Sequence, residues 1–155
     1  MLLSPSLTRG DIVLAAFPFA DLSSTKRRPA VIIAVDTVRG DFTLAFITSQ
    51  QAASAGADET AILPSHSEFP ATGLTVPSKI RAGKLVTLAP RLLTRRLGRL
   101  GPLLTEALDQ ALLAALSINT TRYQEEGRRT ERLTALHLAG GSAALLADLN
   151  LPASV

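Results

Sequence analysis

The 155-residue sequence contains no cysteine and no tryptophan, and aromatic residues make up only 4% of it. Without cysteine the chain has no disulfide, no thiol nucleophile and no cysteine-ligated zinc or iron–sulfur centre, and two histidines offer few imidazole ligands. So few aromatic rings exclude a nucleic-acid reader built on several stacking platforms. Any chemistry therefore depends on other side chains.

Long apolar runs are also missing. No stretch of 18 apolar residues occurs, and Arg9 and Asp11 interrupt the N-terminal segment before the apolar core of a signal peptide can form. We therefore expect a soluble protein of the cytoplasm with no membrane partner. Hydrophobic residues still make up 46% of the chain, enough to fill the core of one compact domain with an appended terminal element.

Acidic side chains are almost absent from the middle of the chain. Residues 61–101 carry a net charge of +6, although the whole chain carries only +3. Such a segment attracts polyanions and contacts phosphates, so nucleic acid is the natural partner; a solvated basic face that serves solubility is the alternative. The seven basic residues of this segment are Lys79, Arg81, Lys84, Arg91, Arg95, Arg96 and Arg99. Upstream, Lys26, Arg27 and Arg28 add to them.

Short runs rich in β-branched residues predict a mainly β fold. Gly40 and Asp41 separate two such runs and predict a tight hairpin. In residues 94–100 the alternation of apolar and polar side chains is imperfect, so this segment is compatible with a strand or a helical turn. The predicted strands are residues 12–17, 30–35, 42–48, 60–63 and 79–88, the last broken at Gly83. Residues 18–29 are expected to form a surface loop, and residues 51–59 a mobile connection.

Helices are predicted only in the C-terminal part. Pro102 suits the first turn of a helix, and the apolar residues 104, 108, 111, 112 and 115 recur at helical spacing along one face. From Asn119 onward the composition changes, and an Ala/Leu-rich stretch follows over residues 133–149. We expect a helical extension over residues 118–155, whose role, covering an edge, extending a dimer interface or binding another protein, stays open.

An ordered set of short motifs resembles the PemK/MazF family of growth-inhibiting toxins over residues 8–117. The motifs are Arg9-Gly-Asp-Ile-Val13, Phe17-Pro-Phe19 with Asp21-Leu22, Lys26-Arg-Arg-Pro-Ala30, Ile47-Thr-Ser-Gln50, Lys84-Leu-Val-Thr-Leu88 and Arg96-Leu-Gly-Arg-Leu100. The resemblance implies an α+β fold, a small SH3-like antiparallel barrel of the PemK/MazF/CcdB kind with a C-terminal helix. This agrees with the strands and the helix predicted above.

The resemblance also implies an activity. Members of this kind act as homodimers that cleave single-stranded RNA, chiefly mRNA, at selected sequences without metal or cofactor. A cognate antitoxin regulates them by placing a disordered segment in the RNA groove. By the same resemblance Arg28 and Thr48 are the expected catalytic residues, because a planar cation and a hydroxyl suit the charged phosphorane. The expected RNA-binding residues are Lys26, Arg27, Ser49, Gln50, Lys79, Arg81 and Lys84.

One departure keeps other functions open. The family often has an acidic residue two positions after the arginine that corresponds to Arg81, and this chain has Gly83. A non-catalytic toxin of the same fold, inhibiting by binding as gyrase poisons do, is one alternative. A basic RNA-binding module that recruits a partner through its tail is another. His66 and His137 are interpreted as surface side chains and not as general bases.

Overall fold

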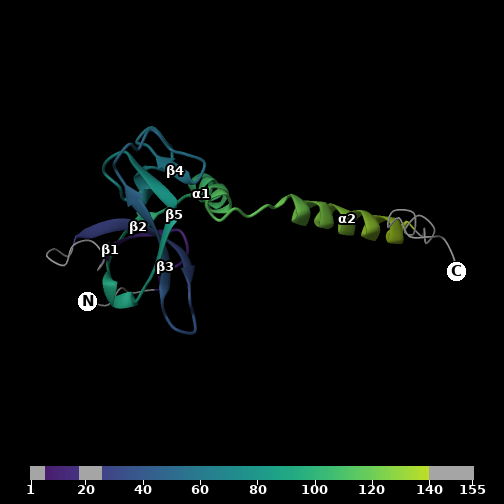
Figure 1. The fold of residues 1–155 in the computed structure, drawn as a ribbon, viewed down its shortest axis with the longest axis horizontal. Helices are drawn as coiled ribbons and strands as arrows, with labels where there is room; N and C mark the ends of the chain where they lie inside the picture. Colours follow the sequence, from purple (N-terminus) through teal and green to yellow (C-terminus); the bar gives the residue numbers. More distant parts are fainter. Residues whose placement is uncertain (1–5, 18–25, 140–155) are drawn as a thin grey trace. The chain divides into compact units, whose positions relative to one another are not determined.

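Six β-strands of the computed structural model form one antiparallel sheet in the first of two compact units, residues 1–117 and 118–155 (Figure 1). The structure describes residues 6–17 and 26–139. The strand order is β4-β5-β3-β2-β1-β6, and one helix, α1 (Pro102–Ala115), contacts β4 and β5. The strands are β1 (Asp11–Ala16), β2 (Arg27–Val35), β3 (Phe42–Thr48), β4 (Glu59–Ile62), β5 (Ser78–Leu88) and β6 (Leu93–Arg99).

This arrangement confirms the predicted α+β class and the antiparallel barrel-like sheet with its C-terminal helix. The sheet is not closed, because no ladder joins β4 to β6 among the described residues. Residues 93–99 form a strand, which decides against the helical turn. The hairpin at Gly40 is confirmed: its φ is +80°, and Asp36 and Asp41 close it through a backbone hydrogen bond of 2.9 Å.

β5 runs unbroken through Gly83, where the sequence predicted a break. Ala45 of β3 pairs with Leu85, whereas the next residue, Phe46, pairs with Arg81, so residues 82–84 form a bulge. A bulge lets a strand bend without ending it. Gly83, which suggested a break, therefore lies within this bulge. The bulge lets the side chains of Arg81 and Lys84 line one groove.

Apolar residues fill the space on both faces of the sheet. One cluster joins α1 to the strands through Leu104, Leu108, Ala111 and Leu112, four members of the predicted helical stripe, and Ala115 packs at its margin. The other cluster is formed by β1, β2 and neighbouring residues, including Val13, Ala30 and Leu44. Burial of these side chains on two faces explains why the strands read as short continuous apolar runs.

Two carboxylates hold distant segments together. Asp11, whose side chain is 5% exposed, accepts hydrogen bonds from Thr8 N (2.8 Å), Arg96 Nε (3.1 Å) and Arg99 Nη1 (3.4 Å). Glu68 accepts the amides of Leu103 and Leu104 at 2.8 and 2.9 Å and so caps the first turn of α1. The first contact gives the Arg9-Gly-Asp and Arg96-Leu-Gly-Arg motifs a structural role, because it joins β1 to β6.

The second unit contains α2 (Thr121–Leu138), as expected of a helical extension, and this helix buries none of its residues. Residues 140–155, which include the end of the Ala/Leu-rich stretch, lie outside the described residues. In the parts of the chain that are described, neither helix combines the length and the apolar character needed to cross a membrane.

Candidate functional site

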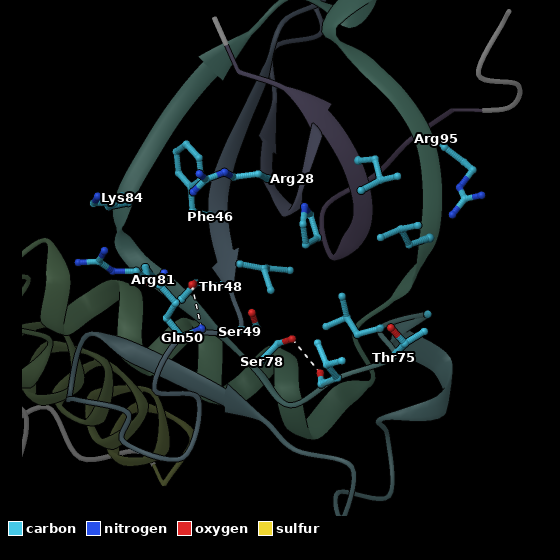
Figure 2. A pocket seen from close by; sticks show the side chains of 17 residues that line it. Arg28, Phe46, Thr48, Ser49, Gln50, Thr75, Ser78, Arg81, Lys84 and Arg95 are labelled. Carbon is cyan, nitrogen blue, oxygen red and sulfur yellow. Dashed lines mark hydrogen bonds between the residues drawn. The ribbon is translucent and has the colours of Figure 1, made fainter. Parts of the chain in front are cut away.

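An open groove of about 730 Å³ lies beside the sheet, lined by side chains from β1, β2, β3, β5 and β6 and from residues 73–76 (Figure 2). Its apolar lining includes Leu14, Phe46, Leu74 and Leu97. The charged residues of its described lining are all cations, without a carboxylate or a histidine. They are Arg28, Arg81, Lys84 and Arg95. A surface of this charge concentrates phosphates.

The groove opens where β2 and β3 separate. Their ladder runs from Val35 and Phe42 to the pair Ala30–Phe46 and extends no further. Beyond that pair, residues 27–29 of β2 pair only with β1, and residues 47 and 48 of β3 pair only with β5. Pro29 fits this position, because a residue without an N–H is tolerated where no neighbouring strand needs one. Arg28 and Thr48 each lie two residues past the last pair, so the separating strands bring them to the same groove.

Arg28 is exposed, and its side chain forms no hydrogen bond or ion pair with any described residue. Figure 2 shows Arg28 and Phe46 among the side chains that line the groove. That ring stacks on Phe17 with a centroid distance of 4.1 Å, and Phe17 is buried. The groove lining therefore includes a ring held in place by the core, and the side-chain donors of Arg28 are open to a ligand.

Thr48 ends β3 at the margin of the groove. Its hydroxyl oxygen accepts the amide of Gln50 at 3.1 Å, which leaves the hydroxyl hydrogen free to donate to a ligand. Gln51 then takes a left-handed conformation, with φ +48°, that is costly for a residue other than glycine. Ser49 and Gln50, which the sequence predicts to bind RNA, are exposed at this turn and line the groove.

Lys79 occupies a different environment from the one expected for an RNA-binding residue. Its side chain is 9% exposed, and Nζ lies 3.0 Å from Glu59 Oε2, 3.1 Å from Glu59 Oε1 and 3.0 Å from Ser54 O. The ammonium is thus neutralised by β4 and anchors the loop that precedes it. Lys79 does not line the main groove, although it borders a smaller hollow that shares Thr48, Gln50 and Arg81 with it.

Arg81 is held loosely by the same carboxylate. Its Nε lies 3.7 Å from Glu59 Oε2, and nearly half of its side chain is exposed. The Gly56 amide, the hydrogen bond from Lys79 and the charges of Lys79 and Arg81 together hold the pKa of Glu59 below its usual value, against the opposing effect of burial. Glu59 is therefore a fixed anion next to Arg81. The side chain of Lys84, by contrast, has no hydrogen-bonding partner among the described residues.

The geometry at Gly83 bears on the departure noted in the sequence. A Cβ there would lie 3.5 Å from Asp58 Oδ2 and 3.9 Å from the Cβ of Ala115, and Gly83 is not among the residues that line the groove. A side chain at this position would point toward Asp58 and α1. An acidic residue here would add a second negative charge beside Asp58 and no group to the groove lining.

Lys26 and Arg27 are exposed at the start of β2, next to Arg28, but do not line the groove. The greater part of the expected 18–29 loop, with Asp21 and Leu22, lies outside the described residues. His66 is half-buried, and its Nδ1 accepts the amide of Glu68 at 3.0 Å. In the described ranges 6–17 and 26–139, His, Asp and Glu side chains do not gather in groups of three or more.

Sequence reasoning missed two parts of this site. Arg95 lines the groove from β6, and residues 73–76 with Leu97 line it nearby. Leu14, another lining residue, pairs with Arg95 across β1 and β6. The strand register that creates this neighbourhood shifts twice along β1. No sequence pattern separates Arg95 from the adjacent Arg96, so only the structure identifies it.

The fold and the groove together define a small antiparallel β protein with a site suited to a polyanion. Residues 8–116 match the family of PemK-like, MazF-like toxins of type II toxin–antitoxin systems. The match spans well over half of the chain, so the protein belongs to this family, which confirms the resemblance seen in its motifs. No curated protein matches the sequence significantly.

Solved structures show a similar fold. An endoribonuclease from Mycobacterial species, in complex with its cognate antitoxin, matches with a TM-score of 0.55 and 21% identity, covering 74% of this chain and 98% of that one. Mycobacterium tuberculosis toxin MazF-mt6 matches with a TM-score of 0.55 and 24% identity, and the match covers 70% of this chain and 98% of that one. MazF from Deinococcus radiodurans matches with a TM-score of 0.52 and 20% identity, and the match covers 70% of this chain and 94% of that one.

Proposed function

We propose that this protein is the growth-inhibiting toxin of a type II toxin–antitoxin pair and that it cleaves single-stranded RNA, chiefly mRNA, at selected sequences without metal or cofactor. The observation that carries the proposal is the joint position of Arg28 and Thr48 where β2 and β3 separate, in a groove whose described charged lining is cationic. Membership of the toxin family supports the class of activity.

The chemistry follows from these two side chains. In metal-free cleavage the ribose 2′-oxygen attacks the adjacent phosphorus, and the bond to the 5′-oxygen of the next nucleotide breaks. The 2′-hydroxyl gives its proton to water, and the departing 5′-oxygen takes up a proton from water, since the described lining holds no carboxylate or histidine. The products carry a 2′,3′-cyclic phosphate and a 5′-hydroxyl. Negative charge grows on the phosphorane, and Arg28 donates to its non-bridging oxygens while the free hydroxyl hydrogen of Thr48 donates to another. Both interactions are stronger in the transition state than with the substrate.

The remaining residues bind the strand around this centre. Arg81 and Lys84 contact the RNA backbone, and Ser49 and Gln50 hydrogen-bond bases or sugars from the exposed turn after β3. Lys26 and Arg27 add cationic contacts from the start of β2. Lys79 acts indirectly, because its contact with Glu59 fixes the loop and the carboxylate next to Arg81.

The partner we propose is an antitoxin whose disordered segment occupies the same groove of a homodimeric toxin in the cytoplasm. Acidic side chains match Arg28, Arg81 and Lys84, and apolar ones match the floor formed by Phe46 and Leu74. Cross-linking of the antitoxin from a variant with a photoreactive residue at position 49 tests this. An antitoxin that still binds this variant but forms no cross-link from position 49 would contradict it.

The test of the activity is a cleavage assay on long single-stranded RNA in the presence of EDTA, with mapping of the 5′ ends. We expect the wild type to cut at a short motif and Arg28→Ala to cut at least 100-fold more slowly, the usual loss of one transition-state donor. Arg28→Lys, which keeps the charge without the planar fork, retains part of the rate. Thr48→Ala loses activity, whereas Thr48→Ser keeps the hydroxyl and most of the rate.

The matched control is Arg39→Ala. Arg39 is an exposed arginine of the β2–β3 hairpin that pairs with Asp36 at 3.2 Å and does not line the groove. Equal cutting by all of these variants would mean that another nuclease is responsible. No cutting by a folded wild-type dimer would favour inhibition by binding. A 2′-deoxy nucleotide at the cut site abolishes cleavage if the 2′-oxygen is the nucleophile.

A further inference from the structure

The cations of the groove lie on two opposite sides of it. The proposed cleavage centre lies on only one of these sides. Figure 2 shows Arg28, Arg81 and Lys84 on one side, from β2 and β5, and Arg95 on the other, from β6. Leu97 of the same strand also lines the groove. Arg95 therefore extends the cationic lining away from Thr48.

The arginines of β6 differ in what they already contact. Arg96 and Arg99 donate to the buried carboxylate of Asp11 at 3.1 and 3.4 Å. Arg95 is exposed, and its side chain forms no hydrogen bond or ion pair with any described residue. Its position in the sheet explains the difference, because Arg95 lies opposite Leu14, which itself lines the groove. Of these three, Arg95 alone lines the groove.

Apolar side chains border the groove between these cations. Leu14, Pro29, Leu74 and Leu97 all belong to the lining. A single strand of RNA presents unstacked bases as well as phosphates, and an apolar surface flanked by cations fits both. Double-stranded nucleic acid keeps its bases stacked inside and gains nothing from this floor.

We propose that Arg95 binds a backbone phosphate of single-stranded RNA other than the scissile one, so that the substrate spans the groove from the Arg28–Thr48 centre to β6. This inference rests on the proposed function and deepens it. Arg95 is a binding residue in this account, with no role in bond breaking. Its contribution therefore appears only when the ligand is long enough to reach β6.

The experiment measures binding without cleavage. The probes are a 2′-O-methylated RNA 12-mer, which lacks the 2′-hydroxyl nucleophile, and a dinucleotide monophosphate. The affinity of each probe for wild type, Arg95→Ala and Arg95→Lys is measured over a range of salt concentrations. For the 12-mer we expect Arg95→Ala to weaken binding about 5- to 10-fold at low salt and to reduce the slope of log K against log salt by about 0.7, the value of one phosphate contact on a single strand. Arg95→Lys restores most of both, because a point charge suffices for a phosphate.

The dinucleotide and a second arginine supply the controls. Arg95→Ala leaves dinucleotide binding unchanged, since one phosphate occupies the centre at Arg28. Arg91→Ala removes an exposed arginine near the start of β6 that borders another hollow, and leaves both probes unaffected. Unchanged 12-mer affinity and slope in a folded Arg95→Ala would overturn the proposal. So would equal weakening of the two probes, which would place the effect in the structure of the groove.

The outcomes also separate this inference from the proposed function. A wild type that binds the 12-mer through Arg95 but cuts no RNA would support the binding path and contradict the nuclease. A wild type that cuts RNA with an Arg95→Ala variant of unchanged 12-mer binding would support the nuclease and contradict the binding path.

Discussion

β5 and β6 carry the whole basic segment of the chain between them, apart from Arg91, yet they use it differently. In β5 one cation, Lys79, is buried against Glu59, while Arg81 and Lys84 line the groove. In β6 two cations, Arg96 and Arg99, hold Asp11, and Arg95 lines the groove. Counting charge along the sequence therefore overstates what is left for a ligand. The carboxylates of other strands decide which cations remain available.

The largest effect we expect from breaking this arrangement is at the Glu59–Lys79 pair. Glu59→Gln removes the charge that neutralises a nearly buried ammonium, and loss of one partner of such a pair costs roughly 3 kcal/mol of unfolding free energy. Urea denaturation measures it. The double variant Glu59→Gln with Lys79→Met restores most of the stability, because no unpaired charge remains. Equal losses in the single and double variants would show that the pair itself is not the cause.

The next largest effect tests β6. Asp11→Asn weakens the hydrogen-bond acceptor for Arg96 and Arg99 and lowers the unfolding free energy by about 2 kcal/mol. This loss is smaller than the loss from Glu59→Gln, because both arginines are half-exposed and can bond to water instead. Arg95→Ala changes the unfolding free energy by less than about 0.5 kcal/mol, as surface substitutions do. Similar losses for these two variants in thermal melts would contradict the division of roles along β6.

Acid titration sharpens the same comparison. The pKa of Glu59 is lowered by the Gly56 amide and by Lys79, and that of Asp36 by hydrogen bonds from Arg39 and the amide of Val38. Since both folded pKa values lie below the unfolded ones, this stability is fully present above the unfolded pKa near 4 and is lost as the pH falls through the folded values. Wild-type stability therefore drops below about pH 4.5. In Glu59→Gln the drop is shallower, and an unchanged profile would exclude Glu59 as a contributor.

A small effect is expected at Gly83. Gly83→Asp places a carboxylate near Asp58 and α1, so we expect less than a twofold change in RNA cleavage and a loss of about 0.5 kcal/mol from like-charge repulsion. The control is Gly83→Ala, which adds the Cβ without the charge. A Gly83→Asp variant that cuts RNA tenfold faster would show that the missing acidic residue does limit activity.

Local patterns predicted most of the strands and α1, because β-branched runs, the turn at Gly40 and the apolar stripe of the helix act within a few residues. The features that sequence reasoning missed involve residues far apart in the chain. Lys79 meets a carboxylate 20 residues away, and α1 is capped by Glu68 from 35 residues away. The role of Arg95 depends on a register that shifts twice along β1. The family resemblance implied that Arg28 and Thr48 share one site. The structure brings both residues to one groove, because β2 and β3 separate there.

The most direct test compares the salt dependence of binding to one single-stranded 2′-O-methylated RNA across a set of single alanine variants. We predict that the slope of log K against log salt falls by about 0.7 for each cation of the groove lining and stays at the wild-type value for cations outside that lining. The first group is Arg28, Arg81, Lys84 and Arg95; the second is Arg39, Arg91, Arg96 and Arg99. An equal decrease in both groups would contradict the account, because it would mean that the RNA responds to the overall charge and not to the groove.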